Sequence, residues 1–521
     1  MNDAVAAPPP RDALAWRRLA ASLILGFASG LPLALSGTAL QAWLTVAGLD
    51  VSTIGFLTLI GLPYTFKFLW APLMDRWEPP LLGRRRGWIV VCQLGLVVSL
   101  FVLSYLSPAN IGGIGAVAAF VAFLSASQDV VIDAWRTDTL SAAERGHGAS
   151  TSVLGYRLAM VLSGGIALIW ADPAQGGMTW PEVYRKLAVI LAIAGAIGVA
   201  VAPPAPARPA TAGEPPMRQE LLGFLAVAAA AVLGWFAASY PGAWLGHTLV
   251  APLGFSEKVT KGGADLVALA LGVAVALPTG AQLAKRLGYA TLTRSLEGFL
   301  AQPHARALLL AVVLFKLGDA FCMALNTTFL LKGAGFTSAQ VGVVNKVFGI
   351  WLTVVGSLIG GIFLPRLGLV RALVGFGALQ AVAVLGFFFL SLTGAGALGA
   401  FEMPPFDLGV VWLKESVTVD GGMLAAVALE NVTSGMGTAA FVALLMSLSA
   451  SRFSATQYAL VSALAALGRV WVGPFAGVIA ETAGWPTLFF VGFWAGWPGV
   501  WMVWRLRETI AAMAGEGSAR G

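Results

Sequence analysis

The chain has 521 residues, of which 58% are hydrophobic and 11% are charged, and its mean hydropathy is +0.83. Soluble domains carry about 25% charged residues, so this composition excludes an ordinary soluble protein. The net charge of +7 comes from basic loops between apolar runs and gives no support to nucleic-acid binding.

Apolar runs separated by turn-forming and charged residues recur along the whole chain. Each is long enough for a transmembrane helix, which needs about 20 apolar residues to cross a bilayer. We therefore expect an all-α polytopic membrane protein with about 14 transmembrane helices. The predicted spans are residues 19–47, 52–74, 87–107, 112–135, 148–170, 182–202, 220–245, 263–286, 305–331, 338–364, 370–393, 421–449, 455–480 and 485–506.

The distribution of basic residues predicts the orientation of these spans. Most Lys and Arg residues outside the spans fall on one side of the membrane if the N-terminus is cytoplasmic. The positive-inside rule therefore places both termini in the cytoplasm. We expect no cleavable signal peptide, because the first apolar run is too long for one. The cytoplasmic tails are residues 1–18 and 507–521.

An internal repeat divides the chain into two halves. Ala47–Leu49 with Ile54-Gly55 recurs, at the same spacing, as Ala334–Phe336 with Val341-Gly342. Each copy joins the first two spans of a six-span half, and same-direction repeats of six helices are typical of the major facilitator fold. The predicted units are an N-terminal bundle at 19–202, a C-terminal bundle at 305–506 and a central linker at 203–304. This linker carries two inserted spans and an amphipathic segment at 289–302.

The loop between the second and third spans carries a candidate gating motif. It consists of Asp75, Arg76, Gly83, Arg84 and Arg85, and it resembles the motif that the major facilitator superfamily has between its helices 2 and 3. The alternative is a basic loop that only obeys the positive-inside rule. That alternative accounts for the arginines but not for the positions of Asp75 and Gly83.

In the N-terminal half, ionisable residues lie inside predicted spans, where they are costly and often mark an ion or substrate path. Asp129 and Asp133 are four residues apart and share a helix face, next to Gln128. Arg157 on the following span returns to a similar depth, so Asp129 and Arg157 can meet. They form either a proton-exchanging pair or a static ion pair, and Asp133 is either part of the pair or solvated at the interface.

The C-terminal half has a similar group of residues. Lys316 and Asp319 are neighbours on one helix face, and Glu430 with Asn431 lies on a later span. Together they predict a polar cavity in which Arg157, Lys316 and Asn431 bind substrate. Asp129, Asp319 or Glu430 would carry the proton, with Asp133 as a further candidate. A purely structural Lys316–Asp319 pair is the alternative.

Four more residues are candidate substrate ligands because they are polar and lie near these charges. They are Gln41, Tyr64, Tyr156 and Gln128, the last beside Asp129. The aromatic rings can stack on sugar faces, but interfacial anchoring or core packing is the commoner role of a single ring. Lys67 lies near the end of its span, where a lysine can reach the interface, so we give it less weight.

The motifs of several other functional classes are absent. The sequence has no Gly-x-x-x-x-Gly-Lys-[Ser/Thr] loop for ATP, and His147, His247 and His304 are too scattered for a metal site or a catalytic triad. Cys92 and Cys322 stand alone in separate spans, so we expect both to be packing residues. We expect no enzyme activity, no cofactor, no metal and no obligate protein partner.

Taken together, several segments of both halves resemble the AmpG family of muropeptide permeases in the major facilitator superfamily. The segments are Gly26–Leu33, Phe66–Arg76, Gly83–Trp88, Ser125–Asp129, Asp133–Trp135, Gly155–Arg157, Lys316–Asp319, Val341–Lys346, Gly435–Gly437, Phe453–Gln457 and Gly468-Arg469. The resemblance implies proton-driven import of N-acetylglucosaminyl-1,6-anhydro-N-acetylmuramyl peptides across the Gram-negative inner membrane. It also implies a place in peptidoglycan recycling and, in some species, in β-lactamase induction.

The chain departs from the enterobacterial pattern of this family in two places. Its two additional spans lie between the halves rather than after the twelfth core helix, and its loop 394–420 is longer. Rival interpretations are an acetyl-coenzyme A transporter or another solute permease of the same superfamily, a polytopic membrane enzyme, and a lipid scramblase. The sequence lacks the acidic or metal-binding loop motif that a membrane enzyme normally needs. A scramblase would need polar residues along a groove open to lipid.

Overall fold

Long helices dominate the computed structural model, which describes residues 13–79, 82–140, 144–206, 216–253, 257–289, 304–407, 409, 412–448 and 454–513. Twelve stretches of the described residues are long and apolar enough to cross a membrane. One of them, Val470–Arg505, runs through two helices, and the long helix Met217–Val250 is not among the twelve. The helices otherwise follow the predicted spans to within a few residues. The predicted amphipathic segment at 289–302 lies almost entirely outside the described residues.

The N-terminal half forms six helical rods, several of them broken into consecutive pieces. Rod one breaks at Gly37, and rod two contains two 3-10 turns. In chain order the pieces are α1 (Ala13–Ser36) and α2 (Thr38–Val46); α3 (Val51–Leu57), η1 (Thr58–Gly61), α4 (Leu62–Phe66), η2 (Lys67–Leu69) and α5 (Ala71–Arg76); α6 (Arg84–Tyr105); α7 (Ile111–Thr139); α8 (Arg145–Val161), η3 (Leu162–Ile166), α9 (Ala167–Ala171) and the turn η4 (Pro173–Gln175); and α10 (Trp180–Val201).

The C-terminal half repeats this plan. Its pieces are α14 (Ala305–Phe315), α15 (Leu317–Ala324), α16 (Asn326–Thr328) and η6 (Phe329–Gly333); α17 (Ser338–Val341), η7 (Gly342–Phe348) and α18 (Gly349–Leu367); α19 (Leu369–Thr393); α20 (Gly421–Leu448); α21 (Ser454–Ala483); and α22 (Trp485–Arg505) with α23 (Arg507–Met513). The turns η3, η6 and η7 are π-helical. Single π-turns inside longer helices occur frequently at functional sites.

The repeat found in the sequence has a structural counterpart. Gly48 and Gly335 end the first rod of their halves with positive φ angles of 87° and 77°. Gly83 and Gly368 begin the third rod of each half with φ angles of 75° and 77°. Only glycine adopts such angles at little cost, so each repeated glycine is required by the backbone turn that it makes.

Glycines also let helices within each half approach closely. A Cβ at Gly30 of α1 would lie 2.6 Å from the carbonyl oxygen of Tyr156 in α8. A Cβ at Gly360 of α18 would lie 2.8 Å from the Cα of Met436 in α20. Small residues at such crossings let helices pack backbone to backbone in a membrane. The crossings bring the polar residues of α8 and α20 next to the centre of each half.

Two seams join the halves, and each contains a glycine of the repeat. At the first seam, Gly55 of α3 packs on Gly473 and Gly477 of α21, and a Cβ at Gly55 would lie 2.6 Å from the carbonyl oxygen of Gly473. At the second seam, Gly342 of η7 packs on Gly165 of η3, and a Cβ at Gly342 would lie 2.7 Å from the carbonyl oxygen of Gly165. The internal repeat therefore marks the two places where the halves touch most closely.

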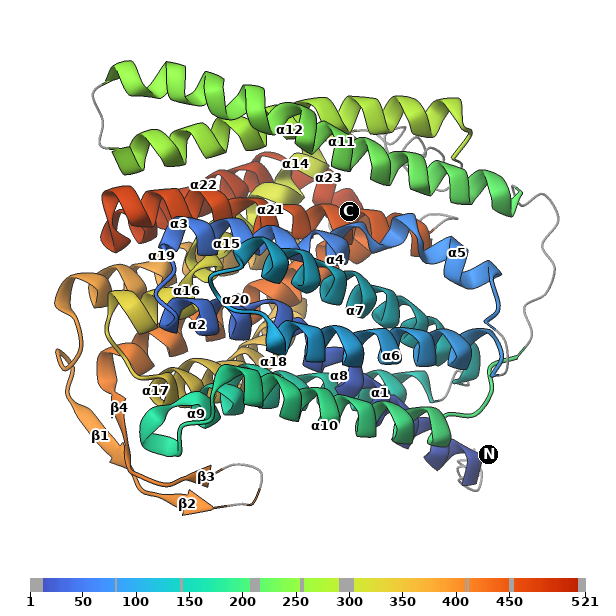
Figure 1. Ribbon diagram of the computed structural model, residues 1–521, viewed down its shortest axis with the longest axis horizontal. Coiled ribbons are helices and arrows are strands. Elements are labelled where there is room, and N and C mark those ends of the chain that lie inside the picture. The colour runs from blue at the N-terminus through green and yellow to red at the C-terminus, as the bar shows by residue number, and fades with distance from the viewer. Residues whose placement is uncertain are drawn as a thin grey trace, which may run out of the picture.

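The inserted helices form a hairpin on the outside of the bundle. Helices α11 (Met217–Val250, followed by η5, Ala251–Leu253) and α12 (Glu257–Arg286) pack along each other and form a separate layer in Figure 1. Tyr289, just after α12, donates a hydrogen bond to the carbonyl of Leu69. Gly262 packs on Val478 of α21. The hairpin thus touches both halves, beside the seam between α3 and α21.

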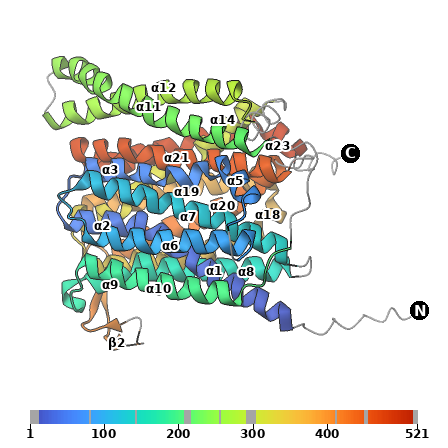
Figure 2. The ribbon, with the colours of Figure 1, turned by 45° about the vertical axis from the view of Figure 1, so that its right-hand side comes forward.

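The two ends of the bundle differ. Figure 2 shows α1 beginning and α23 ending at the same end, which we call the termini end. The loop 394–420 carries four short strands at the opposite end, which we call the ribbon end. Strand β1 (Ala400–Met403) pairs antiparallel with β4 (Val417–Asp420), and β2 (Phe406–Asp407) pairs antiparallel with β3 (Trp412–Leu413). We call the described part of this loop the strap.

Candidate functional site

In the N-terminal half, Asp129 lies at the meeting point of three rods. Ser29 of α1 donates a hydrogen bond to its carboxylate. The Lys67 ammonium of η2 lies 3.8 Å from its other oxygen, and the Asp129 side chain is only 14% exposed. Tyr64 and Tyr156 are also close enough to interact electrostatically with Asp129. This is an acid–base cluster inside a membrane-spanning bundle.

The expected partnership between Asp129 and Arg157 is not present in this structure. Asp129 pairs with Lys67, and among the described contacts Arg157 forms no ion pair with it. Lys67 is the weaker candidate from the sequence, because a lysine near the end of a span can reach the interface. The breaks at η1 and η2 place it beside α7 instead. Asp133 is 60% exposed and pairs with Arg136 at 2.6 Å, which agrees with the solvated alternative.

The other N-terminal candidates differ in how they are held. Gln128 is fully buried, and its amide group has no hydrogen-bond partner within the protein. The Tyr64 hydroxyl is likewise buried without a satisfied hydrogen bond, and Tyr156 is partly buried on α8. Gln41 instead donates to the carbonyl of Ala324 at 3.1 Å and so bridges the halves. Unsatisfied buried polar groups call for a partner such as water or a ligand.

The C-terminal half contains a second buried cluster. Lys316 and Asp319 form an ion pair at 3.7 Å with side chains 5% and 8% exposed. Lys316 also donates to Thr438, and Ser434 donates to Asp319. Glu430 of α20 is 2% exposed and has Asp319, Lys316 and Lys346 as its electrostatic neighbours. Two carboxylates and two ammonium groups therefore share this interior, and Lys346 was not among the predicted site residues.

Asn431 lies beside this cluster but on the neighbouring face of α20. Its side chain donates to the carbonyl of Val427 at 2.9 Å and accepts from the Thr353 hydroxyl of α18 at 2.8 Å. Both parts of the amide are therefore engaged within the protein. A substrate would have to compete with Thr353 for the Asn431 carbonyl oxygen.

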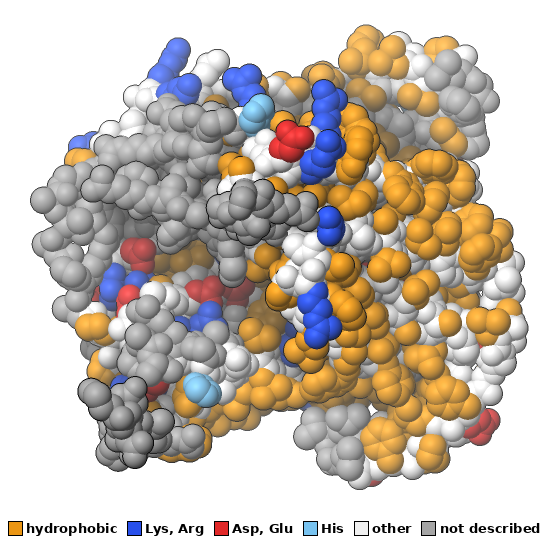
Figure 3. All heavy atoms as spheres, turned by 180° about the vertical axis from the view of Figure 1, so that it is seen from behind, with side chains coloured by type: hydrophobic (Ala, Val, Ile, Leu, Met, Phe, Trp, Pro, Cys, Tyr) orange, Lys and Arg blue, Asp and Glu red, His pale blue; other side chains and the backbone are white. Residues whose placement is uncertain are grey.

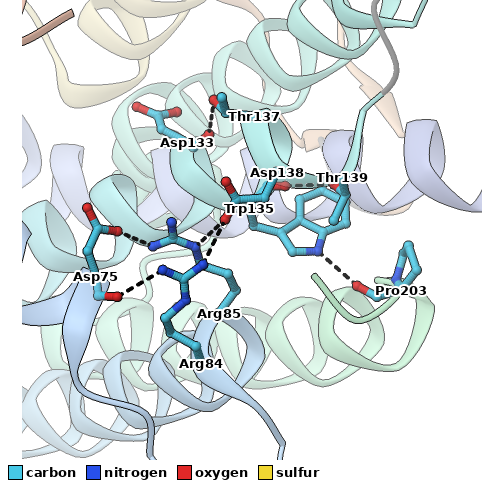
Figure 4. Close-up of polar contacts among 9 residues, drawn as sticks. All are labelled: Asp75, Arg84, Arg85, Asp133, Trp135, Thr137, Asp138, Thr139 and Pro203. Atoms are coloured by element: carbon cyan, nitrogen blue, oxygen red, sulfur yellow. Dashed lines mark hydrogen bonds and ion pairs between the residues drawn. The ribbon is translucent and has the colours of Figure 1, made fainter. Parts of the chain in front are cut away.

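The predicted gating motif forms a compact network at the termini end (Figure 4). Arg85 pairs with the carboxylate of Asp75 at 2.5 Å, and Arg84 donates to the Asp75 backbone carbonyl at 2.8 Å. Both arginines also reach Asp138 of α7, at 3.3 Å and 2.8 Å. Gly83 begins α6 with its positive φ. The side chain of Arg76 lies outside the described part of the structure.

Asp138 is a residue that the sequence analysis missed. It ties the start of α6 to the end of α7, whereas the motif was read only along the loop between the second and third spans. Its position nine residues after Asp129, at the same basic end of the bundle, was the available signal. A negative charge there is the expected counterion for two adjacent arginines.

At the ribbon end, side chains of the N-terminal half hold the C-terminal half. Asp172, which is 3% exposed, accepts a hydrogen bond from the backbone N–H of Ala339 at 2.7 Å. Gln175 accepts from the N–H groups of Lys414 and Glu415 and donates to the carbonyl of Glu415. These bonds join the two halves at this end of the molecule.

An aromatic contact reinforces the strap. Trp170 of α9 stacks on Trp412 of β3 with ring centroids 5.8 Å apart. The Lys186 ammonium lies 3.7 Å from the Trp170 ring centroid and 4.8 Å from that of Trp412. Cation–π contacts of this length are favourable, more so when desolvated. The strap therefore joins the halves through polar and aromatic contacts together.

The termini end carries a group of charged side chains. Figure 3 shows acidic and basic side chains gathered in a hollow at the left, which is the termini end in that view, while hydrophobic side chains gather on the right. Hydrogen bonds between the halves at the ribbon end and a charged hollow at the termini end therefore distinguish the two ends of the bundle.

Comparison with known proteins agrees with this geometry. The family model of the Major Facilitator Superfamily matches residues 22–301. The anhydromuropeptide permease of Escherichia coli (strain K12) is 40% identical over 494 residues, which cover 95% of this chain and 80% of that protein. A putative transporter AmpG 4 of Rickettsia conorii is 24% identical, covering 95% of this chain and 97% of its own.

Solved structures share the fold at low sequence identity. A POT family transporter in complex with a thioalcohol-conjugated peptide has a TM-score of 0.59 at 13% identity, covering 94% of this chain and 96% of that one. The xylose transporter XylE from E. coli has a TM-score of 0.54 at 10% identity, covering 95% of both chains. These likenesses show the architecture alone. Together with the family match and the 40% identical relative, they show that this chain is a multi-pass inner-membrane transporter, not an enzyme, and that it belongs to the AmpG permease family of the major facilitator superfamily.

Proposed function

We propose that this chain is a proton-coupled symporter that imports N-acetylglucosaminyl-1,6-anhydro-N-acetylmuramyl peptides from the periplasm into the cytosol for peptidoglycan recycling. The observation that carries the proposal is its 40% identity, over 95% of its length, to an anhydromuropeptide permease. The two buried acid–base clusters support the proton coupling, because intramembrane carboxylates beside cations are typical of proton paths.

The transport cycle alternates access between the two ends of the bundle. The basic loops assign the termini end to the cytosol and the ribbon end to the periplasm. The bonds of Asp172 and Gln175 and the charged hollow at the termini end support a cytosol-facing state for this structure. The bundles 19–202 and 305–506 act as the two rocking units, and 203–304 carries the inserted hairpin.

Cargo binding falls to polar side chains around the two clusters. Muropeptides present peptide carboxylates, amides and sugar hydroxyls, which suit cations, amides and aromatic rings. The cargo ligands that we assign are Arg157, Lys316, Asn431, Gln41, Tyr64, Tyr156 and Gln128. Arg157 and Gln128 are the strongest of these, because neither side chain has a hydrogen bond or ion pair among the described residues.

Proton binding falls to the carboxylates of the clusters. Asp129 has one cationic partner, and Asp319 and Glu430 share two. Each carboxylate can exchange its ion pair for a proton when cargo competes for the cation. Asp133 is the weaker candidate because it is 60% exposed and paired with Arg136. The network of Asp75, Arg76, Gly83, Arg84 and Arg85, anchored by Asp138, acts as the cytosolic gate.

The test is uptake of labelled N-acetylglucosaminyl-anhydromuramyl tripeptide into proteoliposomes. We expect accumulation that requires an inward proton gradient and disappears with an uncoupler. Excess unlabelled disaccharide should compete, and acetyl-coenzyme A should not. Competition by acetyl-coenzyme A instead, or no uptake by folded protein, would refute the cargo. Uptake unaffected by the uncoupler would refute the proton coupling.

A further inference from the structure

The second seam between the halves is built from two unusual helical turns. Both η3 (Leu162–Ile166) and η7 (Gly342–Phe348) are π-helical, and they pack against each other. Their glycines, Gly165 and Gly342, meet backbone to backbone. A contact this close leaves no room for compression, so any relative rotation of the halves must change the position of η7 against η3.

Lys346 is the charged residue of this seam. It lies four residues after Gly342 in η7, and a Cβ built on Gly165 would lie 3.1 Å from the Cβ of Lys346. The root of the lysine side chain therefore packs on the opposite half. One helical turn of displacement at the seam would carry this side chain with it.

The charged head of Lys346 belongs to the cluster in its own half. Glu430 of α20 is its electrostatic neighbour. The other charged or titratable groups that face Glu430 from the described elements are Lys316, Asp319 and Cys322, all on the first C-terminal rod. Lys316 is already engaged by Asp319 and Thr438. Lys346 is thus the cation near Glu430 that also touches the other half.

We propose that Lys346 is a positioning residue that couples the protonation of the Glu430–Asp319 pair to the rocking of the two halves. While Glu430 is charged, it attracts Lys346 and holds η7 in the position seen here. When a proton neutralises Glu430, this attraction is lost and the seam is free to shift. The inference deepens the proposed proton symport and rests on it.

The neighbouring amides fit this role. Asn345 of η7 donates to Asn326 of α16 at 3.4 Å, and both side chains are buried. This long hydrogen bond ties η7 to the rod that carries Lys316 and Asp319. A shift of η7 would therefore change the surroundings of both Asp319 and Glu430.

The first experiment separates gradient-driven accumulation from cargo exchange at equal pH on both sides. We expect Lys346→Met to reduce accumulation about 10-fold, a size typical of coupling between sites, while exchange persists. Lys346→Arg should restore accumulation because it keeps the charge. Lys285→Met, at an exposed position of α12, is the matched control. Accumulation by Lys346→Met at the wild-type level would overturn the proposal.

The second experiment needs no cargo, so it stands even if the proposed function fails. Spin labels at Ser107→Cys, in the loop after α6, and at Thr393→Cys, the last residue of α19, are both exposed and report the distance between the halves. The native Cys92 and Cys322 are buried. We expect the wild-type distance to change between alkaline and acidic pH, and Glu430→Gln to give the acidic distance at both.

Adding Lys346→Met to the labelled protein should remove this response to pH. A purely structural role for Lys346 predicts lower stability with an unchanged response, and that result would overturn the coupling. So would a Glu430→Gln variant that keeps the alkaline distance at alkaline pH. A wild-type protein that responds to pH but takes up no muropeptide would refute the cargo and leave the role of Lys346 standing.

Discussion

At the scale of single residues, Asp129 shows how a membrane carboxylate can hold and release a cation. Its hydrogen bond from Ser29 keeps the carboxylate in place, whereas Lys67, at 3.8 Å and 35% exposed, is a looser partner. A proton on Asp129 would leave the Ser29 contact intact and remove the attraction for Lys67. The lysine is then free to turn toward the carboxylates of an arriving peptide.

We expect Lys67→Met to leave the Asp129 charge without its cation and to lower the free energy of unfolding by about 1–3 kcal/mol. The double variant Lys67→Met/Asp129→Asn should recover much of this loss, because no unpaired charge remains. Thermal unfolding of the purified protein in detergent measures both. Strictly additive effects in this double-mutant cycle would show that the two side chains are not coupled.

At the scale of elements, the strap is the largest feature of the ribbon end. It belongs to the C-terminal half in sequence, yet the partners of its Trp412, Lys414 and Glu415 are Trp170 and Gln175 of the N-terminal half. Opening the ribbon end must break these contacts. The strap therefore stabilises the state that is closed at this end.

We expect Gln175→Ala to favour the state that is open at the ribbon end, because it removes three hydrogen bonds to the strap. A reporter at Thr45→Cys, where α2 meets Thr328 of the other half and the side chain is 7% exposed, should then react about 10-fold faster with a membrane-impermeant thiol reagent. Gln219→Ala, which removes a bond to Leu287 in the hairpin, is the control. Equal rates in both variants would show that the strap does not hold this end closed.

The sequence predicts the limits of the long helices well and the side-chain contacts between them poorly. Span limits depend on local hydropathy, so 485–506 and 370–393 correspond to α22 and α19 almost residue for residue. The pairing of Asp129 with Lys67 depends on breaks in rod two that hydropathy does not register. The strands of the strap depend on contacts with Gln175, more than two hundred residues away. Lys346 was visible only as part of a family segment, because its neighbours come from three different rods.

At the scale of the whole molecule, the two glycine seams are the contacts about which the halves can move. Gly55 meets Gly473 and Gly477, and Gly342 meets Gly165. Gly55 and Gly342 are equivalent positions of the repeat, so the repeat seen in the sequence also relates the two seams. The proposed rocking of the two halves would move both seams together.

We expect Gly342→Ala and Gly55→Ala to slow transport strongly, because each new Cβ would lie 2.6–2.7 Å from a backbone oxygen of the other half. Uptake rates in proteoliposomes, with elution profiles as a check on folding, measure the effect. Gly375→Ala is the matched control, since a Cβ there meets nothing within 4 Å. Wild-type rates in both seam variants would mean that the halves do not pivot at these glycines.

The inserted hairpin has to follow one half or the other when they move. Its bond to the N-terminal half, from Tyr289 to the carbonyl of Leu69, is directional and depends on a fixed geometry. Its contact with the C-terminal half, Gly262 on Val478, is apolar and has no preferred direction. The apolar contact can slide, whereas the hydrogen bond resists displacement. We therefore expect the hairpin to move with the N-terminal bundle and to slide along α21.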